Sequence, residues 1–268
     1  MLVRKAAVAG RFYPGDPRIL ENDVRSFLSP ATQTITALGC VVPHAGYMYS
    51  GEVAGTVYAN LNIPQRCIVM CPNHTGFGQP LSIMSEGWWE TPLGRIPIDS
   101  ELATKLKMKF PLFQEDAEAH RTEHATEVQL PFLQVIKKNL SFVPITLGIR
   151  QFEILEALGT GIADVVALQN EPVLLIASSD MNHYENDAVT RIKDHKAIDQ
   201  ILKLDPRGLF DVVMREEISM CGFGPTVVML TAVNRLGAKQ AELVKYATSG
   251  DVSGDRNTVV GYAGILVR

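Results

Sequence analysis

Short apolar runs alternate with longer amphipathic stretches along almost the whole chain, and this alternation constrains the fold more than any other feature. Buried strands of a parallel sheet read as continuous apolar runs, whereas the helices that cross between them carry apolar residues at a helical period. The pattern predicts an α/β fold with a central, mostly parallel or mixed sheet flanked by helices. Neither a fixed-period repeat nor a Pro-, Gly- or Ser-rich linker interrupts the pattern, so one domain over residues 1–268 is expected.

Three of the apolar runs are the strands on which the functional argument depends. They are residues 35–42, ended by Pro43, residues 67–71 (CIVMC), ended by Pro72, and residues 173–177 (VLLIA), followed by SSDMNH. Residues 81–85 and 94–98 are expected to pair as a hairpin that carries Trp88 and Trp89. Further strands are expected over residues 142–146, 241–248 and 258–267, and helices over residues 50–60, 100–109, 123–138, 151–168, 187–204 and 225–236.

Composition and charge exclude several classes of protein. The chain has 268 residues, of which 46% are hydrophobic, and a formal net charge of −4. A basic face that would hold nucleic acid or an acidic membrane surface is therefore not expected. The start of the chain turns polar before an apolar signal core accumulates, and no run of about eighteen apolar residues occurs. We expect a cytoplasmic protein without a signal peptide or a membrane span.

The four cysteines do not resemble a secreted disulfide framework, so reduced thiols are expected. Cys40, Cys67 and Cys71 lie in strand-like runs and are predicted to be core residues. Cys221 lies in ISMCGFGPTVV, where glycines and a proline make a tight turn before an apolar helix. A thiol near a helix N-terminus has a lowered pKa and can serve as a thiolate ligand or a nucleophile. The alternative is that Cys221 is buried and inert.

Histidines follow the three functional strands where each strand ends. His44 comes after the first strand, His74 after the second, and Asp180 with His183 after the third. Ligands of open α/β sheets bind beyond the carboxyl ends of the strands, so these side chains are expected to converge on one rim of one sheet. Two neutral imidazoles and one anionic side chain, either Cys221 or a carboxylate such as Asp180, make an open metal site.

Other roles remain open for the same residues. A single histidine in such a position can cap a helix or bond a backbone carbonyl, and Asp180 can cap the turn that follows it. Taken together, Asp180 and His183 indicate an acid–base pair, or a carboxylate that fixes the tautomer of an imidazole beside the metal.

A second constellation competes with the first. His120, Glu123 and His124 fit the H-x-x-E-H pattern of inverted zinc peptidases, in which two histidines on one helix bind zinc and the glutamate activates water. If the helix begins only at about Thr122, His120 lies outside it and this geometry fails. Glu123 and Glu127 are then acidic residues placed at the favourable end of the helix dipole.

Six motifs together resemble the Memo family in order and across nearly the whole chain. They are AGRFYP, VVPHAGYMYSG, CPNHTG, EHATEVQLPFL, SSDMNH and MCGFGP. The resemblance is to prokaryotic members, which form a three-protein system with an AMMECR-domain protein and a radical SAM protein, so these two are the partners that it implies. It also implies a fold similar to class III extradiol dioxygenases, which hold non-haem Fe(II) with two histidines and a glutamate.

Memo proteins carry a cysteine in place of that glutamate. In this sequence, the resemblance places the metal ligands at His44, His74 and Cys221, with Asp180 and His183 in the neighbouring, catalytic positions. A soft thiolate changes metal preference and redox potential, so copper or a redox role is favoured at least as much as ring cleavage. The fold alone does not transfer an activity.

Three functional hypotheses follow. The first is a metal-binding redox protein that uses iron or copper, with zinc as a further candidate. The second is a non-catalytic module that holds a peptide in the same cleft, with Trp88, Trp89, Tyr47 and Tyr49 as aromatic contacts. The third is the zinc peptidase that requires His120 and His124.

Overall fold

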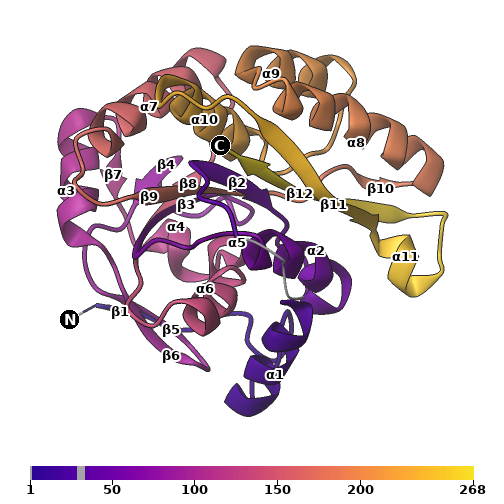
Figure 1. The fold of residues 1–268 in the computed structure, drawn as a ribbon, viewed down its shortest axis with the longest axis horizontal. Helices are drawn as coiled ribbons and strands as arrows, with labels where there is room; N and C mark the ends of the chain where they lie inside the picture. The colour runs from indigo at the N-terminus through magenta and orange to yellow at the C-terminus, as the bar shows by residue number, and fades with distance from the viewer. Residues whose placement is uncertain (1, 29–33) are drawn as a thin grey trace.

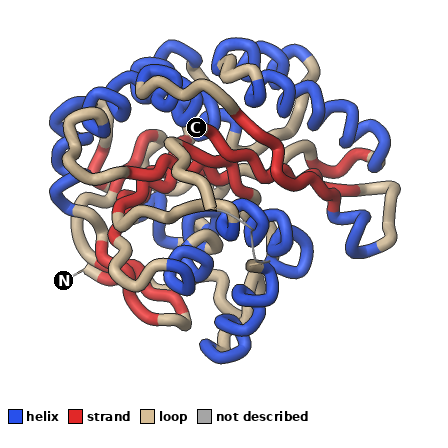
Figure 2. Tube along the Cα trace, viewed as in Figure 1, coloured by secondary structure: helices blue, strands red, loops and turns tan. Residues whose placement is uncertain are grey.

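In a computed structural model, which describes residues 2–28 and 34–268, helices cover both faces of a large mixed sheet (Figures 1 and 2). The strands are β1 (Val3–Arg4), β2 (Gly39–Val42), β3 (Arg66–Pro72), β4 (Leu81–Ile83), β5 (Trp88–Thr91), β6 (Gly94–Pro97), β7 (Gln114–Glu115), β8 (Ser141–Leu147), β9 (Val173–Ser178), β10 (His183–Glu185), β11 (Ala241–Thr248) and β12 (Val259–Val267). The helices are α1 (Pro17–Phe27), α2 (Tyr47–Ala59), α3 (Ser100–Lys109), α4 (Glu118–Arg121), α5 (His124–Glu127), α6 (Leu130–Ile136), α7 (Phe152–Val166), α8 (Asp187–Leu202), α9 (Pro206–Arg215), α10 (Phe223–Arg235) and α11 (Ser249–Ser253).

The large sheet has a parallel centre and antiparallel additions. Among the described residues its order is β10-β12-β2-β9-β3-β8-β4-β7, with β11 paired to β12. The four central strands β2, β9, β3 and β8 are mutually parallel, whereas β12 joins β2 and β4 joins β8 in the antiparallel sense. The α/β fold class and the mixed sheet expected from the sequence are confirmed.

Both faces of the central strands are buried, which explains their continuous apolar sequences. In β3, Ile68 and Met70 point into a core shared with α3, α7, α9 and α10, while Cys67 and Val69 point into a second core shared with α1, α2 and α6. Figure 1 shows these two sets of helices on opposite faces of the sheet. Side chains alternate along a strand, so a strand covered on both faces must be apolar throughout.

The predicted hairpin of residues 81–85 and 94–98 is wrong. β4 pairs with β8 at the edge of the large sheet, and β6 pairs instead with β5, which contains Trp88 and Trp89. Together with β1, these two strands form a separate three-stranded sheet beneath the large one. Trp89 is completely buried there. The tight turn between Thr91 and Gly94 sets this pairing. The prediction failed because it treated the segment with Trp88 and Trp89 as the connection between two strands and not as a strand itself.

The helix expected over residues 123–138 is divided into α5 and α6. Pro131 lies in the first turn of α6 and has no N–H to donate to the carbonyl of Glu127 four residues earlier, so the helical ladder is interrupted there. Helices α1 and α9 were not predicted, although Asp16 caps α1 directly before Pro17 and Asp205 caps α9 directly before Pro206. Both starts carry the aspartate–proline signal of a helix N-terminus.

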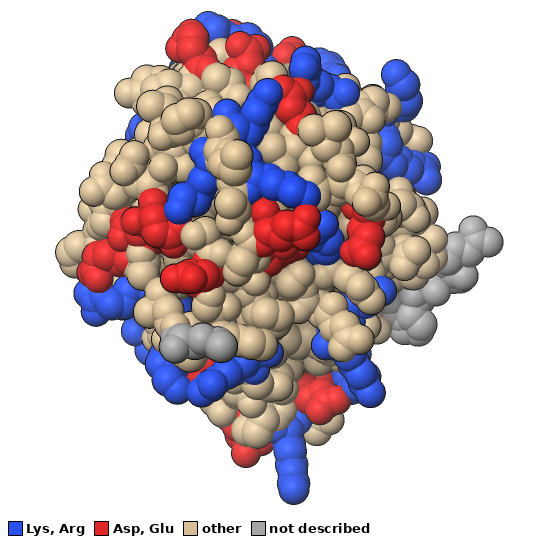
Figure 3. Space-filling model, turned by 90° about the vertical axis from the view of Figure 1, so that its left-hand side faces the viewer, with Lys and Arg blue, Asp and Glu red and all other residues tan. Residues whose placement is uncertain are grey.

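The surface carries charges of both signs. On the face that Figure 3 shows, basic and acidic side chains are interspersed and neither sign forms a continuous patch. No helix among the described residues is long and apolar enough to cross a membrane. Cys40, Cys67 and Cys71 are fully buried in the core, as predicted, and each is a free thiol.

Candidate metal centre

Adjacent parallel strands bring the predicted site residues to one edge of the sheet. β2 and β3 lie on either side of β9 and run in the same direction, so their carboxyl ends meet. His44 follows β2, His74 follows β3, and Asp180 follows β9. The expected convergence on one rim is confirmed.

His44 is buried and its tautomer follows from its hydrogen bonds. Its Nδ1 lies 3.0 Å from Ser178 Oγ, which donates its only proton to the Ala125 carbonyl at 2.6 Å and accepts from Gln129 Nε2 at 2.9 Å. Ser178 can therefore only accept from His44, so Nδ1 carries the proton and Nε2 presents a lone pair. Burial, with the nearby His74, holds the pKa of His44 well below its usual range, so the imidazole is neutral.

Glu123 holds His74 through two hydrogen bonds. The backbone N–H of His74 donates to one carboxylate oxygen at 2.7 Å, and its Nδ1 donates to the other at 2.9 Å. The second bond again leaves Nε2 as the free lone pair. Burial disfavours the charged form of both side chains, but the hydrogen bond between them has the larger effect. As a result, the pKa of Glu123 falls to about 2 and the pKa of His74 rises above its ordinary value.

Cys221 lies beside His44, although the two residues are 177 positions apart in the chain. Its Sγ lies 3.1 Å from His44 Nε2. The turn can approach this closely because Gly222 has no side chain, since a Cβ at that position would lie 2.4 Å from the Ser178 carbonyl oxygen. Burial and the neighbouring Asp180 raise the pKa of the Cys221 thiol well above its ordinary value. The expected lowering of the Cys221 pKa is therefore wrong for the protein without a bound metal. A metal that binds Sγ would have to displace the thiol proton.

The three predicted ligands form a compact donor set. The ligand atoms of His44, His74 and Cys221 all lie within 4.8 Å of one another. Two imidazoles that direct Nε2 toward the site and one thiol fit a transition metal of the iron, copper or zinc group, provided that the metal displaces the protons that these groups carry. A second group, His74, Glu123 and His124, meets the same distance limit, and the rings of His74 and His124 are stacked 4.7 Å apart. Burial, with His44, lowers the pKa of His124 to about 4.

Asp180 and His183 lie beside this donor set, but they are not bonded as a pair in the described structure. Asp180 is buried and accepts the backbone N–H of His44 at 2.7 Å, so it orients the strand end rather than the His183 ring. The tautomer of His183 is set by the Ser219 carbonyl, which lies 2.9 Å from Nδ1. Nδ1 therefore carries a proton, and Nε2 of His183 is the nitrogen not used in this bond. Burial raises the pKa of Asp180 despite its hydrogen bond.

The geometry of the inverted zinc peptidases is absent from the described residues. His120 lies in α4, which ends at Arg121, and His124 begins α5 after Glu123 in an extended conformation. His120 is completely buried and directs Nδ1 to Thr146 Oγ1 at 3.0 Å. No group of possible metal ligands among the described residues includes it. The peptidase reading is therefore wrong in its required geometry.

The proposed aromatic contacts for a peptide are also misplaced. Trp89 is fully buried in the small sheet, and Tyr47 is buried with its hydroxyl donating to the Val128 carbonyl at 2.6 Å. Trp88 lies in the same small sheet, whereas His44 follows β2 of the large sheet. Tyr49 lies in the first turn of α2, which follows the His44 loop, and part of its surface is accessible.

Sequence reasoning missed the residues that set the two tautomers. Ser178 and Gln129 were given no role, and Glu123 was considered only as a peptidase base or a favourable charge at a helix end. A signal was present for Ser178, which directly precedes the predicted site residues in SSDMNH. Nothing local connects Glu123 with His74, 49 positions away.

Comparison with known proteins agrees with the motifs. A family model described as Memo-like protein matches residues 4–266. MEMO1 family proteins of Methanopyrus kandleri and Methanosarcina mazei are 43% and 44% identical to this chain, over 99% and 100% of it and of their own lengths. An uncharacterized protein from Escherichia coli K12 with a solved structure aligns at a TM-score of 0.59, covering 85% of this chain and 98% of its own, with 15% identity. That last likeness shows the fold alone.

Proposed function

This chain belongs to the Memo-like family, and from that premise we propose that it binds an iron or copper ion through His44, His74 and Cys221 and serves a redox reaction. A bound ion of this kind would supply one-electron redox chemistry and polarise an attached substrate. Zinc is the alternative ion, since the same donor set also suits it. The substrate class is addressed in the next subsection.

The observation that carries the proposal is the pair of fixed tautomers. Both His44 and His74 use Nδ1–H to bond a protein acceptor, so both direct the lone pair of Nε2 outward. A metal ligand needs a second nitrogen directed toward the site, and the ligand atoms of both histidines lie within 4.8 Å of the thiol of Cys221. Cys221 Sγ, 3.1 Å from His44 Nε2, adds the soft third donor.

The surrounding side chains would support the reaction without binding the ion. Asp180 holds the backbone of His44 in place, and Glu123 does the same for His74. His183 has a free Nε2 beside the donor set, so it can accept or return a proton at the substrate. Water is excluded on the buried side of the site, where His44 is only 2% exposed.

Anaerobic titration of the parent and variants with Fe(II) and Cu(I) tests the proposal. His44→Ala loses a ligand and should weaken both metals by more than about 100-fold, beyond the range for residues that only orient ligands. Cys221→Ser should weaken Cu(I) much more than Fe(II), because the soft donor is lost. Asp180→Asn should weaken the affinity for both metals by about 10–100-fold.

His195→Ala is the matched control, since His195 lies on the exposed side of α8 and should not affect either metal. Unchanged Cu(I) affinity in Cys221→Ser, combined with loss of metal in His120→Ala, would overturn the proposal and move the site to the α4–α5 segment. Failure of the parent to bind either ion would end the metal hypothesis and favour a non-catalytic binding module.

Family membership also supports two partners and a location. We propose that this chain works in the cytoplasm with an AMMECR-domain protein and a radical SAM protein, as the resemblance of its motifs to prokaryotic Memo proteins implies. Affinity purification from the native organism, with mass spectrometry of the bound proteins, tests this. Recovery of neither partner at native expression would contradict it.

A further inference from the structure

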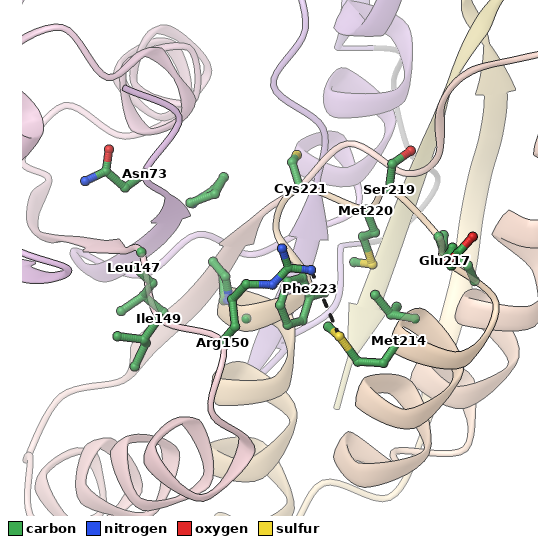
Figure 4. A pocket seen from close by; sticks show the side chains of 16 residues that line it. Asn73, Leu147, Ile149, Arg150, Met214, Glu217, Ser219, Met220, Cys221 and Phe223 are labelled. Atoms are coloured by element: carbon green, nitrogen blue, oxygen red, sulfur yellow. Dashed lines mark hydrogen bonds between the residues drawn. The ribbon is translucent and has the colours of Figure 1, made fainter. Parts of the chain in front are cut away.

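A cavity of about 600 Å³ opens beside Cys221, where the loop after β8 faces the segment between α9 and α10 (Figure 4). The volume lies within the range of about 300–1,000 Å³ typical of sites for small molecules. Apolar side chains make up much of its lining, including Leu147, Ile149, Met220 and Phe223. The cavity thus offers an apolar surface that leads directly to the proposed metal ligand.

One cation in this lining lacks an ionic partner. Arg150 is exposed at the mouth of the cavity and has no carboxylate within 4.0 Å among the described residues. Its guanidinium carbon lies 5.3 Å from the centroid of the Phe223 ring, and Nη2 donates a long hydrogen bond to Met214 Sδ at 4.0 Å. Figure 4 shows the guanidinium extending into the cavity over Phe223.

Arg207 provides a comparison on the neighbouring helix. It also lies over an aromatic ring, that of Phe152 at 4.8 Å, but its charge is balanced by Asp211 at 2.9 Å. Both arginines are exposed and both lie over a ring, so the difference between them is that Arg150 has no carboxylate bound in the described structure. The guanidinium of Arg150 lies over an aromatic ring, and its one side-chain hydrogen bond in the described structure is the long one to Met214 Sδ, so its planar fork can receive a carboxylate in a bidentate manner.

From these contacts we propose that the cavity binds a small amphipathic carboxylate as the substrate of the proposed redox site. The carboxylate would bind Arg150, and the apolar body would lie against Phe223 and Met220 with its far end next to Cys221. This inference rests on the proposed function, because Cys221 belongs to both the metal site and the cavity.

The charge of the lining favours a monoanion over a phosphate. Glu217 is the one acidic residue of the cavity lining, and Figure 4 places it on the other side of Met220 from Arg150. Among the described residues, Arg150 is the one cation of this lining, so a dianion would have a single positive charge to balance its two negative charges. A single carboxylate needs only one guanidinium, whereas phosphate sites commonly use several donors and cations.

The test uses benzoate as the probe and the methionine methyl groups as reporters. Protein labelled with ¹³C in its methionine methyl groups is titrated with benzoate, as purified and after removal of metal by a chelator. Met214 and Met220 line the cavity, so their resonances should shift in both preparations. Benzamide, which has the same shape without the charge, should bind at least about tenfold more weakly, because charge-assisted hydrogen bonds are lost.

Variants decide which residue is responsible. Arg150→Gln should weaken benzoate at least about tenfold, and Arg150→Lys, which keeps the charge but not the fork, should have an intermediate effect. Arg207→Gln is the matched control and should bind benzoate like the parent. Equal binding by Arg150→Gln and parent, equal binding of benzamide and benzoate, or tighter binding of inorganic phosphate would each overturn the proposal.

The same variants separate this inference from the proposed function. Arg150→Gln should keep its affinity for Fe(II) and Cu(I), while His44→Ala should lose metal and keep benzoate. If the parent binds benzoate through Arg150 but no metal, the carboxylate site stands and the redox function fails. If the parent binds metal but benzoate moves neither methionine methyl group, the redox function stands and the carboxylate site fails.

Discussion

Glu123 and Glu127 lie four residues apart in one short segment, and both are completely buried, yet they serve different parts of the molecule. Glu123 faces the sheet edge and holds the imidazole and backbone of His74. Glu127 faces the other way, forms a buried ion pair with Arg4 and accepts hydrogen bonds from the backbone of Ala7 at 2.8 Å and Val8 at 3.1 Å.

The difference shows that the partner, and not burial, determines what a buried carboxylate does. Arg4 is always charged, so its pair with Glu127 is a fixed anchor for the N-terminal segment. Histidine is neutral or charged depending on its surroundings and retains a second nitrogen, so its bond to Glu123 prepares a ligand. One segment therefore combines a structural anchor with a support of the metal site.

The largest expected effect comes from breaking the anchor. Glu127→Gln leaves the Arg4 guanidinium buried without a counter-charge, so the free energy of unfolding should fall by about 3–5 kcal/mol. Urea denaturation measures it. Glu52→Gln, which removes a surface pair with Lys245, is the control and should change stability by less than about 1 kcal/mol. Equal stability of the two variants would show that Glu127 is not an anchor.

A third buried carboxylate sharpens the comparison, because its hydrogen-bond donors are neutral. Asp194 accepts from Tyr246 Oη at 2.6 Å and from the backbone of Asn182 at 2.8 Å, and burial raises its pKa to about 6. Between about pH 4 and pH 6, the folded protein therefore keeps a proton on Asp194 that the unfolded chain has already released. This stabilisation is present below about pH 4 and is lost as the pH rises to about 6 and beyond.

Relative to Asp194→Asn, the parent should lose up to about 3 kcal/mol of stability between pH 4 and pH 7. Asparagine can keep both hydrogen bonds without titrating. Urea denaturation at several pH values measures the difference, with Asp211→Asn as an exposed control. A difference that stays constant across this pH range would contradict the raised pKa of Asp194.

The effect of Glu123 should appear in metal affinity. Glu123→Gln removes the negative charge that orients His74, so affinity for Fe(II) and Cu(I) should fall by about 10–100-fold. Glu118→Gln is the matched control, because Glu118 lies on the exposed side of α4 and pairs with Arg121. Anaerobic metal titration provides the measurement. The same affinity in both variants would place Glu123 outside the metal site.

The smallest effect is expected at His120. His120→Asn keeps a group able to bond Thr146 and leaves only a small void, so it should cost about 1 kcal/mol of stability. Metal affinity should not change, because His120 belongs to no ligand group among the described residues. Loss of metal on the scale of His44→Ala would restore the peptidase geometry that the division between α4 and α5 contradicts.

Much of the fold and the meeting of His44, His74 and Asp180 at one edge follow from local sequence. Apolar runs ended by Pro43 and Pro72 define the parallel strands, and the residues after them define the edge on which His44, His74 and Asp180 meet. This inference succeeds because side-chain period and proline stops are local properties, and because parallel strands have their carboxyl ends at one edge. The motifs were also sufficient for the family.

Tertiary structure alone decided the pairing of the strands and the state of the donors. Strand β5, which contains Trp88 and Trp89, pairs with β6 rather than with the large sheet, and the helix expected over residues 123–138 divides between Glu127 and Leu130. The tautomers of His44 and His74 depend on partners 134 and 49 positions away, and the thiol of Cys221 meets His44 across 177 positions. Burial and hydrogen-bond partners are properties of residues brought together by folding, so the periodicity of one segment does not contain them.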